Sequence, residues 1–95
     1  MMTFESLYEI ICQRRDNPTE ESYTAKLMTW GEDKILKKVG EEAMEVILAA
    51  KAQGDQRLIE ESSDLVYHLF VLLASRNISP ADILAELDKR HQPKQ

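Results

Sequence analysis

The spacing of apolar residues constrains this chain most, because apolar side chains recur every three to four positions almost everywhere. Residues at that spacing share one face of an α-helix, whereas a half-buried strand alternates at every second residue. No segment shows sustained alternation with turn residues at both ends. The sequence therefore predicts an all-α fold, a helical bundle of about five helices.

Local start and stop signals place the first helices. Thr3 is a suitable N-cap for a first helix that stops before the polar segment 16–18, which ends in proline. Ser22 is expected to cap a brief second helix, and Gly31 to end it by taking a conformation that glycine adopts readily. A third helix is predicted from about residue 32 to residue 53.

The second half of the chain carries similar signals. Asp55 is expected to cap a fourth helix that runs to Arg76. Ser79, followed by a proline and an acidic residue, predicts the start of a fifth helix that ends near Arg90. Residues 91–95 hold nothing apolar to anchor them and are expected to fray. With no linker or low-complexity tract, residues 1–95 are predicted to form a single domain.

Composition argues against two classes of partner. The chain has 17 acidic and 12 basic residues and a net charge of −5, whereas a surface for duplex nucleic acid needs clustered Lys and Arg. Its longest apolar block, at 69–74, is far shorter than the ~20 residues that cross a bilayer. The single cysteine, Cys12, cannot form an internal disulfide, which indicates a reducing compartment. We expect a cytoplasmic protein without nucleic-acid or membrane partners.

Two acidic clusters of the same design lie on neighbouring predicted helices. Glu42 and Glu45 belong to the third helix, and Glu61 and Asp64 to the fourth. At about 100° per residue, both pairs border the same flank of their helix's apolar stripe. Antiparallel packing of the two stripes brings equal flanks together. Measured from Gly54, the heights of the two pairs differ by only about 3 Å of helix rise, so the clusters are expected to converge.

Four carboxylates that converge would repel one another unless a cation lay between them. A ligand set of oxygen atoms without cysteine favours Mg²⁺ or Mn²⁺ over Zn²⁺, and leaves positions for water and substrate phosphates. A di-iron centre would use Glu-x-x-His, whereas His68 follows the nearest acid by four positions. Solvated acidic faces are the remaining alternative. The predicted metal ligands are Glu42, Glu45, Glu61 and Asp64.

Three segments carry a resemblance to a known family. The runs at 41–45 and 61–64 resemble the EExxE and ExxD signature of the MazG-like all-α nucleotide pyrophosphohydrolases. Within that superfamily, SYTAKL at 22–27 and the longer segments at 33–51 and 60–79 are similar to the phosphoribosyl-ATP pyrophosphatase family. The similarity covers nearly the whole chain. It implies a MazG-like bundle completed by dimerisation, in a stand-alone form without the cyclohydrolase domain to which some relatives are fused.

The resemblance also implies an activity. The expected reaction is Mg²⁺-dependent hydrolysis of phosphoribosyl-ATP to phosphoribosyl-AMP and pyrophosphate, the second step of histidine biosynthesis. The cation would neutralise and orient the polyphosphate and acidify a water. Glu42 is then a catalytic ligand. Glu41 lies farther round the helix and is either a base that helps to deprotonate the water or a surface residue.

Four residues of the SYTxxL segment match the family near a helix start, where hydroxyl groups and charge suit phosphate or ribose contacts. They are Ser22, Tyr23, Thr24 and Lys26. Lys38 either holds a substrate phosphate or forms an ion pair with the ligand four positions later. Lys37 is a weaker phosphate candidate, and Arg90 is expected to reach a phosphate from a partner chain.

Two neighbours of Asp64 have alternative roles. His68, one turn later, either hydrogen-bonds a ligand carboxylate as a second-shell residue or is a satisfied buried histidine. Tyr67 falls on the opposite side of the helix, which indicates a core or intersubunit contact.

The fourth helix also predicts an assembly. Val71, Leu72 and Ala74 extend its apolar surface beyond the main stripe, so its second half is apolar on most of its circumference. A chain of 95 residues cannot easily cover such a helix alone. We therefore expect a symmetric homodimer.

Two other functions are compatible with these patterns. One is a house-cleaning pyrophosphohydrolase of the same superfamily that acts on ordinary or damaged NTPs, although such enzymes do not share SYTAKL or DLVYHLFVLL. The other is a non-catalytic helical dimerisation module whose acidic faces are only solvated. The second alternative predicts no metal affinity.

Overall fold

The computed structural model describes residues 1–93, and this range contains helices and no strand. The helices are α1 (Phe4–Asp16), α2 (Tyr23–Trp30), α3 (Glu32–Ala52), α4 (Asp55–Ser75) and α5 (Pro80–Arg90). The prediction of an all-α fold with about five helices is confirmed. Residues 94–95, part of the predicted frayed tail, lie outside the described residues. Within the described range, no helix is long and apolar enough to span a membrane.

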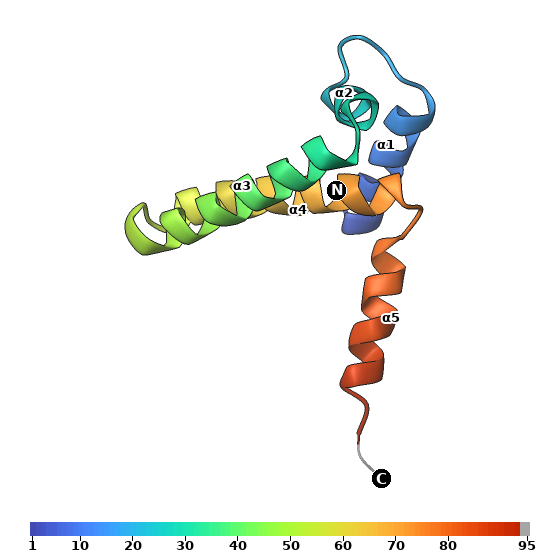
Figure 1. Ribbon diagram of the computed structural model, residues 1–95. Coiled ribbons are helices and arrows are strands. Elements are labelled where there is room, and N and C mark those ends of the chain that lie inside the picture. The colour runs from blue at the N-terminus through green and yellow to red at the C-terminus, as the bar shows by residue number, and fades with distance from the viewer. Residues whose placement is uncertain (94–95) are drawn as a thin grey trace.

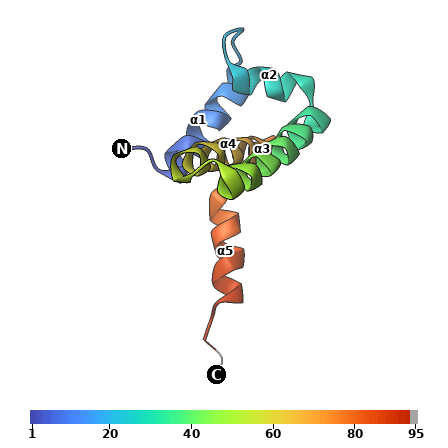
Figure 2. The same ribbon diagram turned by 90° about the vertical axis from the view of Figure 1, so that its left-hand side faces the viewer.

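The longest contact in the fold is the antiparallel pair of α3 and α4, which lie side by side in both ribbon views (Figures 1 and 2). α1 packs against α4, and α2 packs against α1 and the start of α3. The core lies where these four helices meet, since each contributes at least one residue to it. Its buried members are Ile11, Leu27, Ile35, Phe70, Val71 and Ala74.

Three of the predicted N-caps are confirmed. The side-chain oxygens of Thr3, Ser22 and Ser79 each accept a hydrogen bond from a backbone N–H in the first turn of α1, α2 and α5. Gly31 ends α2 with a φ of 99°. This positive φ, which glycine adopts without steric cost, lets α3 begin immediately afterwards.

The prediction that Asp55 caps α4 is wrong. Gly54 is the N-cap, with a φ of 86° and no side-chain hydrogen bond, and Asp55 is the first helical residue. The reversal between α3 and α4 has room for only two residues, and glycine supplies the positive φ that this tight turn needs. Asp55 still favours the helix start, because a carboxylate in the first turn complements the helix dipole.

α4 ends one residue before the predicted Arg76, which is its C-cap. The N–H of Ile78 donates to the carbonyl of Leu73 at 2.9 Å, and the N–H of Asn77 donates to the carbonyl of Ala74 at 3.1 Å. Asn77 has a φ of 56°, a left-handed conformation that asparagine tolerates. These bonds form a Schellman motif that satisfies the last carbonyls of the helix.

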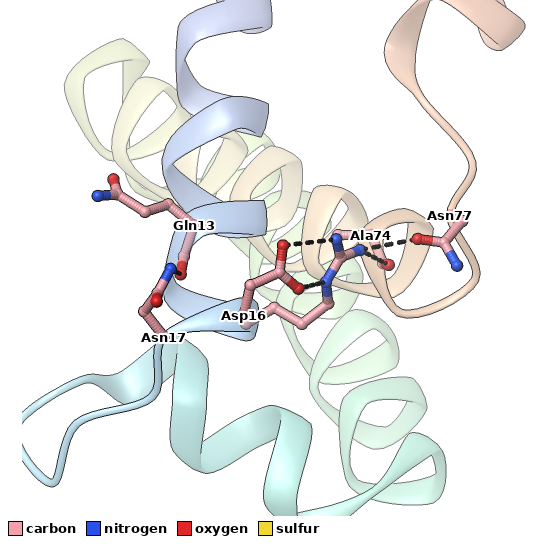
Figure 3. Close-up of polar contacts among 6 residues, drawn as sticks. Gln13, Asp16, Asn17, Ala74 and Asn77 are labelled. Atoms are coloured by element: carbon pink, nitrogen blue, oxygen red, sulfur yellow. Dashed lines mark hydrogen bonds and ion pairs between the residues drawn. The ribbon is translucent and has the colours of Figure 1, made fainter.

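Arg15 on α1 hydrogen-bonds to the C-terminal end of α4 (Figure 3). Its guanidinium donates to the Ala74 carbonyl at 2.6 Å and to Oδ1 of Asn77 at 3.0 Å. It also pairs with Asp16 at 2.8 Å, and this hydrogen bond lowers the pKa of the Asp16 carboxyl. The positive charge of Arg15 therefore lies at the negative end of the α4 dipole.

Arg15→Met is expected to lower the free energy of unfolding by about 1–3 kcal/mol, because the Ala74 carbonyl loses a charged donor. Urea unfolding measures the change. Arg14→Met removes the same charge from an exposed position of the same helix and is expected to have little effect. Equal losses in the two variants would contradict the role of Arg15 at the end of α4.

The contact between α3 and α4 is rotated from the expected stripe-to-stripe packing. Ile35 and Ala49 are buried on α3, but Leu36 and Ile47 of the same stripe are exposed. The contact has moved toward the acidic flank, so that Glu42 is half-buried. Half of the apolar stripe of α3 is thus left uncovered within the chain.

α5 points away from the α3 and α4 pair (Figures 1 and 2). None of its residues is buried, although it is amphipathic and carries three exposed large apolar side chains, those of Ile83, Leu84 and Leu87. An isolated helix of 11 residues is marginal in water. α5 contacts α1 within the described residues, but this contact leaves its large apolar side chains exposed.

Candidate active site

The two acidic clusters converge, as their spacing predicts. Glu42 on α3 and Glu61 and Asp64 on α4 each offer a carboxylate oxygen, and the three oxygens lie within 4.8 Å of one another. The antiparallel packing of α3 and α4 brings these flanks to the same side. The role of the residues as metal ligands stays a prediction.

The oxygens of Glu42, Glu61 and Asp64 fit a hard divalent cation. Mg²⁺ binds oxygen at about 2.0–2.1 Å, so ligands on opposite sides of it are about 4 Å apart. The observed limit of 4.8 Å is only slightly wider. Glu61 is 7% exposed, and a buried carboxylate needs a positive partner. Glu45 lies beside this group of three, lining the same hollow.

The hollow has a volume of about 530 Å³, within the usual range for small-molecule sites. Its walls are almost entirely charged. The lining residues are Lys38, Glu41, Glu42, Met44, Glu45, Glu61 and Asp64. Because carboxylates outnumber the single lysine in this lining, a polyphosphate would be repelled unless a cation reduced the negative charge.

A basic residue lies one helical turn before a carboxylate of the cluster on α3. The Lys38 ammonium is 3.4 Å from Glu42 and 3.7 Å from Glu41. Burial alone would lower the pKa of Lys38, but Tyr23 and the Glu42 and Glu41 carboxylates together raise it. The predicted ion pair is present. Lys38 therefore stays charged at neutral pH and available to an anion, and its phosphate role stays a prediction.

α4 repeats this arrangement with a residue that the sequence reasoning missed. Arg57 donates to Glu61 at 2.7 Å and to Glu60 at 2.6 Å. The hydrogen bond that Arg57 donates to Glu60, followed by the charge of Glu61, raises the pKa of Arg57. The sequence does contain a signal for this contact, because a cation four positions before a carboxylate lies on the same face of a helix. Arg57 neutralises part of the charge of the buried Glu61.

His68 connects α4 to α2. Its Nδ1 is 2.7 Å from the backbone carbonyl of Asp64, which can only accept, so Nδ1 carries a proton. In the neutral imidazole, Nε2 then accepts a hydrogen bond from the Tyr23 hydroxyl at 2.9 Å. His68 is buried and satisfied by these two bonds. The alternative of a bond to a ligand carboxylate is not the one observed.

Tyr67 belongs to the same contact. Its ring stacks on Tyr23 with centroids 6.2 Å apart and meets the edge of His68 at 5.2 Å, and its hydroxyl pairs with Thr24. Of the two predicted roles, the structure shows a contact within the chain, because α2 packs across that side of α4. Thr24 is fully buried by this pairing, which leaves its side chain no face for a ligand.

Tyr23 lies close to the acidic hollow. Burial raises the pKa of its phenol, and the Glu42 and Asp64 carboxylates add to the rise while Lys38 opposes it. The phenol therefore stays protonated at neutral pH and can donate to His68. The start of α2 is fixed in this way beside Asp64.

Tyr23→Phe is expected to lower the free energy of unfolding by about 0.5–1.5 kcal/mol, because it removes the hydrogen bond to His68. Urea unfolding of the single variant, and of the same change in a His68→Phe background, measures the coupling. Without the Nε2 acceptor the effect of Tyr23→Phe should fall close to zero. An equal loss in both backgrounds would show that the bond contributes nothing.

Four other predicted substrate residues do not line the acidic hollow in the described chain. The Ser22 hydroxyl caps α2 by accepting from the N–H of Ala25 at 3.1 Å. Lys26 is exposed and borders a different hollow. Lys37 is exposed on α3. Arg90 is on α5, which points away from the α3 and α4 pair, and its contact with a phosphate from a partner chain stays a prediction.

Comparisons with known proteins identify the family of the chain. Residues 4–91 match the model of the family described as "Phosphoribosyl-ATP pyrophosphohydrolase". A protein of Pelotomaculum thermopropionicum named "Phosphoribosyl-ATP pyrophosphatase" is 57% identical over 93% of this chain and 90% of its own length. A Bacillus thuringiensis protein of the same name is 53% identical over 94% of this chain and 83% of its own length. The chain therefore belongs to the phosphoribosyl-ATP pyrophosphohydrolase family.

Proposed function

We propose that this chain hydrolyses phosphoribosyl-ATP to phosphoribosyl-AMP and pyrophosphate, as the second step of histidine biosynthesis in the cytoplasm. The observation that carries the proposal is the convergence of Glu42, Glu61 and Asp64 in a chain of this family. The names of the two relatives support phosphoribosyl-ATP as the substrate. An acidic hollow of about 530 Å³ supports a ligand whose negative charge is handled through a divalent cation.

The reaction is proposed to depend on Mg²⁺ or Mn²⁺. The residues that would hold the ion are Glu42, Glu45, Glu61 and Asp64. When bound, the ion would supply charge neutralisation for the polyphosphate and a lowered pKa for a water. The all-oxygen donor set supports Mg²⁺ or Mn²⁺ over softer metals.

The chain's own residues contribute binding and proton transfer. Lys38 binds a substrate phosphate from its position between Glu41 and Glu42. Glu41, which is exposed and only loosely paired with Lys38 at 3.7 Å, accepts the proton of the attacking water. The Tyr23 hydroxyl, through His68, holds the backbone of Asp64 in place.

Pyrophosphate release tests this function. The protein is incubated with phosphoribosyl-ATP and with a panel of NTPs, with and without Mg²⁺. Release from phosphoribosyl-ATP alone, and only with Mg²⁺, is the expected result. Preference for an NTP would instead indicate a house-cleaning pyrophosphohydrolase. No pyrophosphate release from any nucleotide would favour the non-catalytic dimerisation module.

We further propose that the working form is a homodimer. The uncovered apolar faces support it: Leu36 and Ile47 on α3 and the exposed Ile83 and Leu84 on α5. An apolar hollow of about 730 Å³ between the start of α1 and the first half of α4 adds to this surface. A monomer would expose all of it to water.

Sedimentation equilibrium tests the assembly. The parent is expected to sediment as twice the chain mass of 10.9 kDa. Ile47→Glu and Leu84→Glu, which place a charge on exposed apolar positions, should shift the protein toward the monomer while its helix content is kept. A parent that is monomeric at micromolar concentration would contradict the proposal.

A further inference from the structure

A cation lies beside the acidic carboxylates in each direction along the α3 and α4 pair: Lys38 lines the hollow, and Arg57 is bonded to Glu61, which lines it. Lys38 is one turn before Glu42 on α3, and Arg57 is one turn before Glu61 on α4. Because α3 and α4 are antiparallel, these turns lie in opposite directions along the pair (Figure 1). Counted from Gly54 at about 1.5 Å per residue, the Cα of Lys38 is about 24 Å from the turn and that of Arg57 about 5 Å. The two basic residues therefore bracket the carboxylates.

An aromatic ring, that of Tyr23, lies near the end of the hollow that Lys38 lines. Tyr23 is 39% exposed and bonds to His68, which is bonded to the carbonyl of Asp64, so its ring lies near the hollow without lining it. Its ring is held rigidly, because it stacks on Tyr67 and bonds His68. A rigid exposed aromatic ring suits a flat base or a sugar face.

The Arg57 end is charged and solvated. Arg57 is bonded to Glu60 and Glu61, and the charge of Glu45 also acts on it. Its side chain is 49% exposed, which leaves donors of its guanidinium open to solvent. A guanidinium offers a planar fork that matches phosphate oxygens.

The bond to Glu61 can open without releasing Arg57. A carboxylate offers about four lone-pair sites, so a cation on Glu61 competes with Arg57 only where it takes the site on Oε1 that accepts from the guanidinium. Glu60 accepts from a different guanidinium nitrogen at 2.6 Å and keeps the side chain in place. Arg57 is then held beside the hollow with donors free for an anion.

We propose that Arg57 binds the pyrophosphate half of the substrate, so that the nucleoside half lies at the opposite end beside Tyr23. The inference rests on the proposed function and gives the substrate a direction along the α3 and α4 pair. The triphosphate end of this substrate carries most of its negative charge and its adenine is flat, and along the α3 and α4 pair the Arg57 guanidinium and the Tyr23 ring lie in the matching order.

Calorimetric titration with pyrophosphate and, separately, with adenosine monophosphate, both in excess Mg²⁺, tests the direction. Arg57→Gln is expected to weaken pyrophosphate binding about tenfold or more, the loss of a charged hydrogen bond, and to leave the monophosphate within about twofold. Arg57→Lys keeps the charge but not the fork and should be intermediate. Arg76→Gln removes another exposed, ion-paired arginine, whose partner Glu32 does not line the hollow, as the matched control.

Unchanged pyrophosphate binding in Arg57→Gln would overturn the inference, as would an equal loss for both ligands or no pyrophosphate binding by the parent. Titration with Mg²⁺ alone checks that the variant still binds the ion. The binding measurements do not need turnover, so the two proposals fail separately. A parent that binds pyrophosphate through Arg57 but releases none from phosphoribosyl-ATP would overturn the proposed function alone.

Discussion

Glu42→Gln and Asp64→Asn are each expected to reduce pyrophosphate release from phosphoribosyl-ATP on the order of a thousandfold, because each removes one of the proposed carboxylate ligands of the cation. The amides keep the size and shape of the side chains, so the packing of α3 and α4 should be unchanged. Initial rates at saturating Mg²⁺ measure the loss. Raising Mg²⁺ further should recover little, since an amide oxygen is a weaker ligand than a carboxylate.

A thermal melt separates this metal role from a structural one. The parent should gain stability with Mg²⁺, since a ligand that binds only the folded state stabilises it by mass action. Glu42→Gln should lose that gain and melt no lower than the parent without Mg²⁺, because like charges are removed. Glu9→Gln, the same change on the exposed face of α1, is the control. A Glu42→Gln variant that keeps both turnover and the Mg²⁺-dependent gain would refute the site.

The convergence of the acidic clusters was predictable because it depends on regular geometry. Helical periodicity fixes the flank on which Glu42 and Glu61 lie, and a tight turn at Gly54 fixes their heights. Neither step needs knowledge of side-chain packing. The same reasoning placed Thr3 and Ser79 at helix starts, because N-capping is a local interaction between neighbours in sequence.

The misassigned cap shows where two local signals compete. Gly54 and Asp55 are both acceptable N-caps by composition. The backbone decides between them, since a reversal of only two residues needs a positive φ that aspartate adopts with difficulty. The N-cap preferences of single residues do not depend on the length of the turn, so they cannot choose between these two positions.

Other features of the site depend on tertiary packing, and helix geometry alone did not predict them. Tyr67 lies on the side of α4 away from the acidic strip, and only the placement of α2 shows that it stacks on Tyr23. Arg57 was not among the predicted site residues, although its spacing of four positions from Glu61 places both on one helix face. The angle at which α3 meets α4 was likewise not predictable, since the acidic flank and the apolar stripe compete for the same contact.

Leu27→Ala is expected to lower the free energy of unfolding by about 2–5 kcal/mol, a large part of the roughly 5–15 kcal/mol of a domain this size. Leu27 is fully buried in the core where α2 meets its neighbours. α2 has only 8 residues, too few to form a stable helix alone, so its position depends on such anchors. Urea unfolding measures the loss. Because α2 carries Tyr23, the variant should also lose the coupling between Tyr23 and His68.

The control for this effect is Leu27→Met, which preserves volume and is expected to cost less than about 1.5 kcal/mol. The difference between the two variants isolates the cavity left in the core by the shorter side chain. If α2 were held mainly by its polar bonds, such as that between Tyr23 and His68, Leu27→Ala would cost no more than Leu27→Met. A large difference, together with a normal Mg²⁺-dependent gain in the fraction that stays folded, would show that the core fixes α2 while the carboxylates of α3 and α4 bind the ion independently.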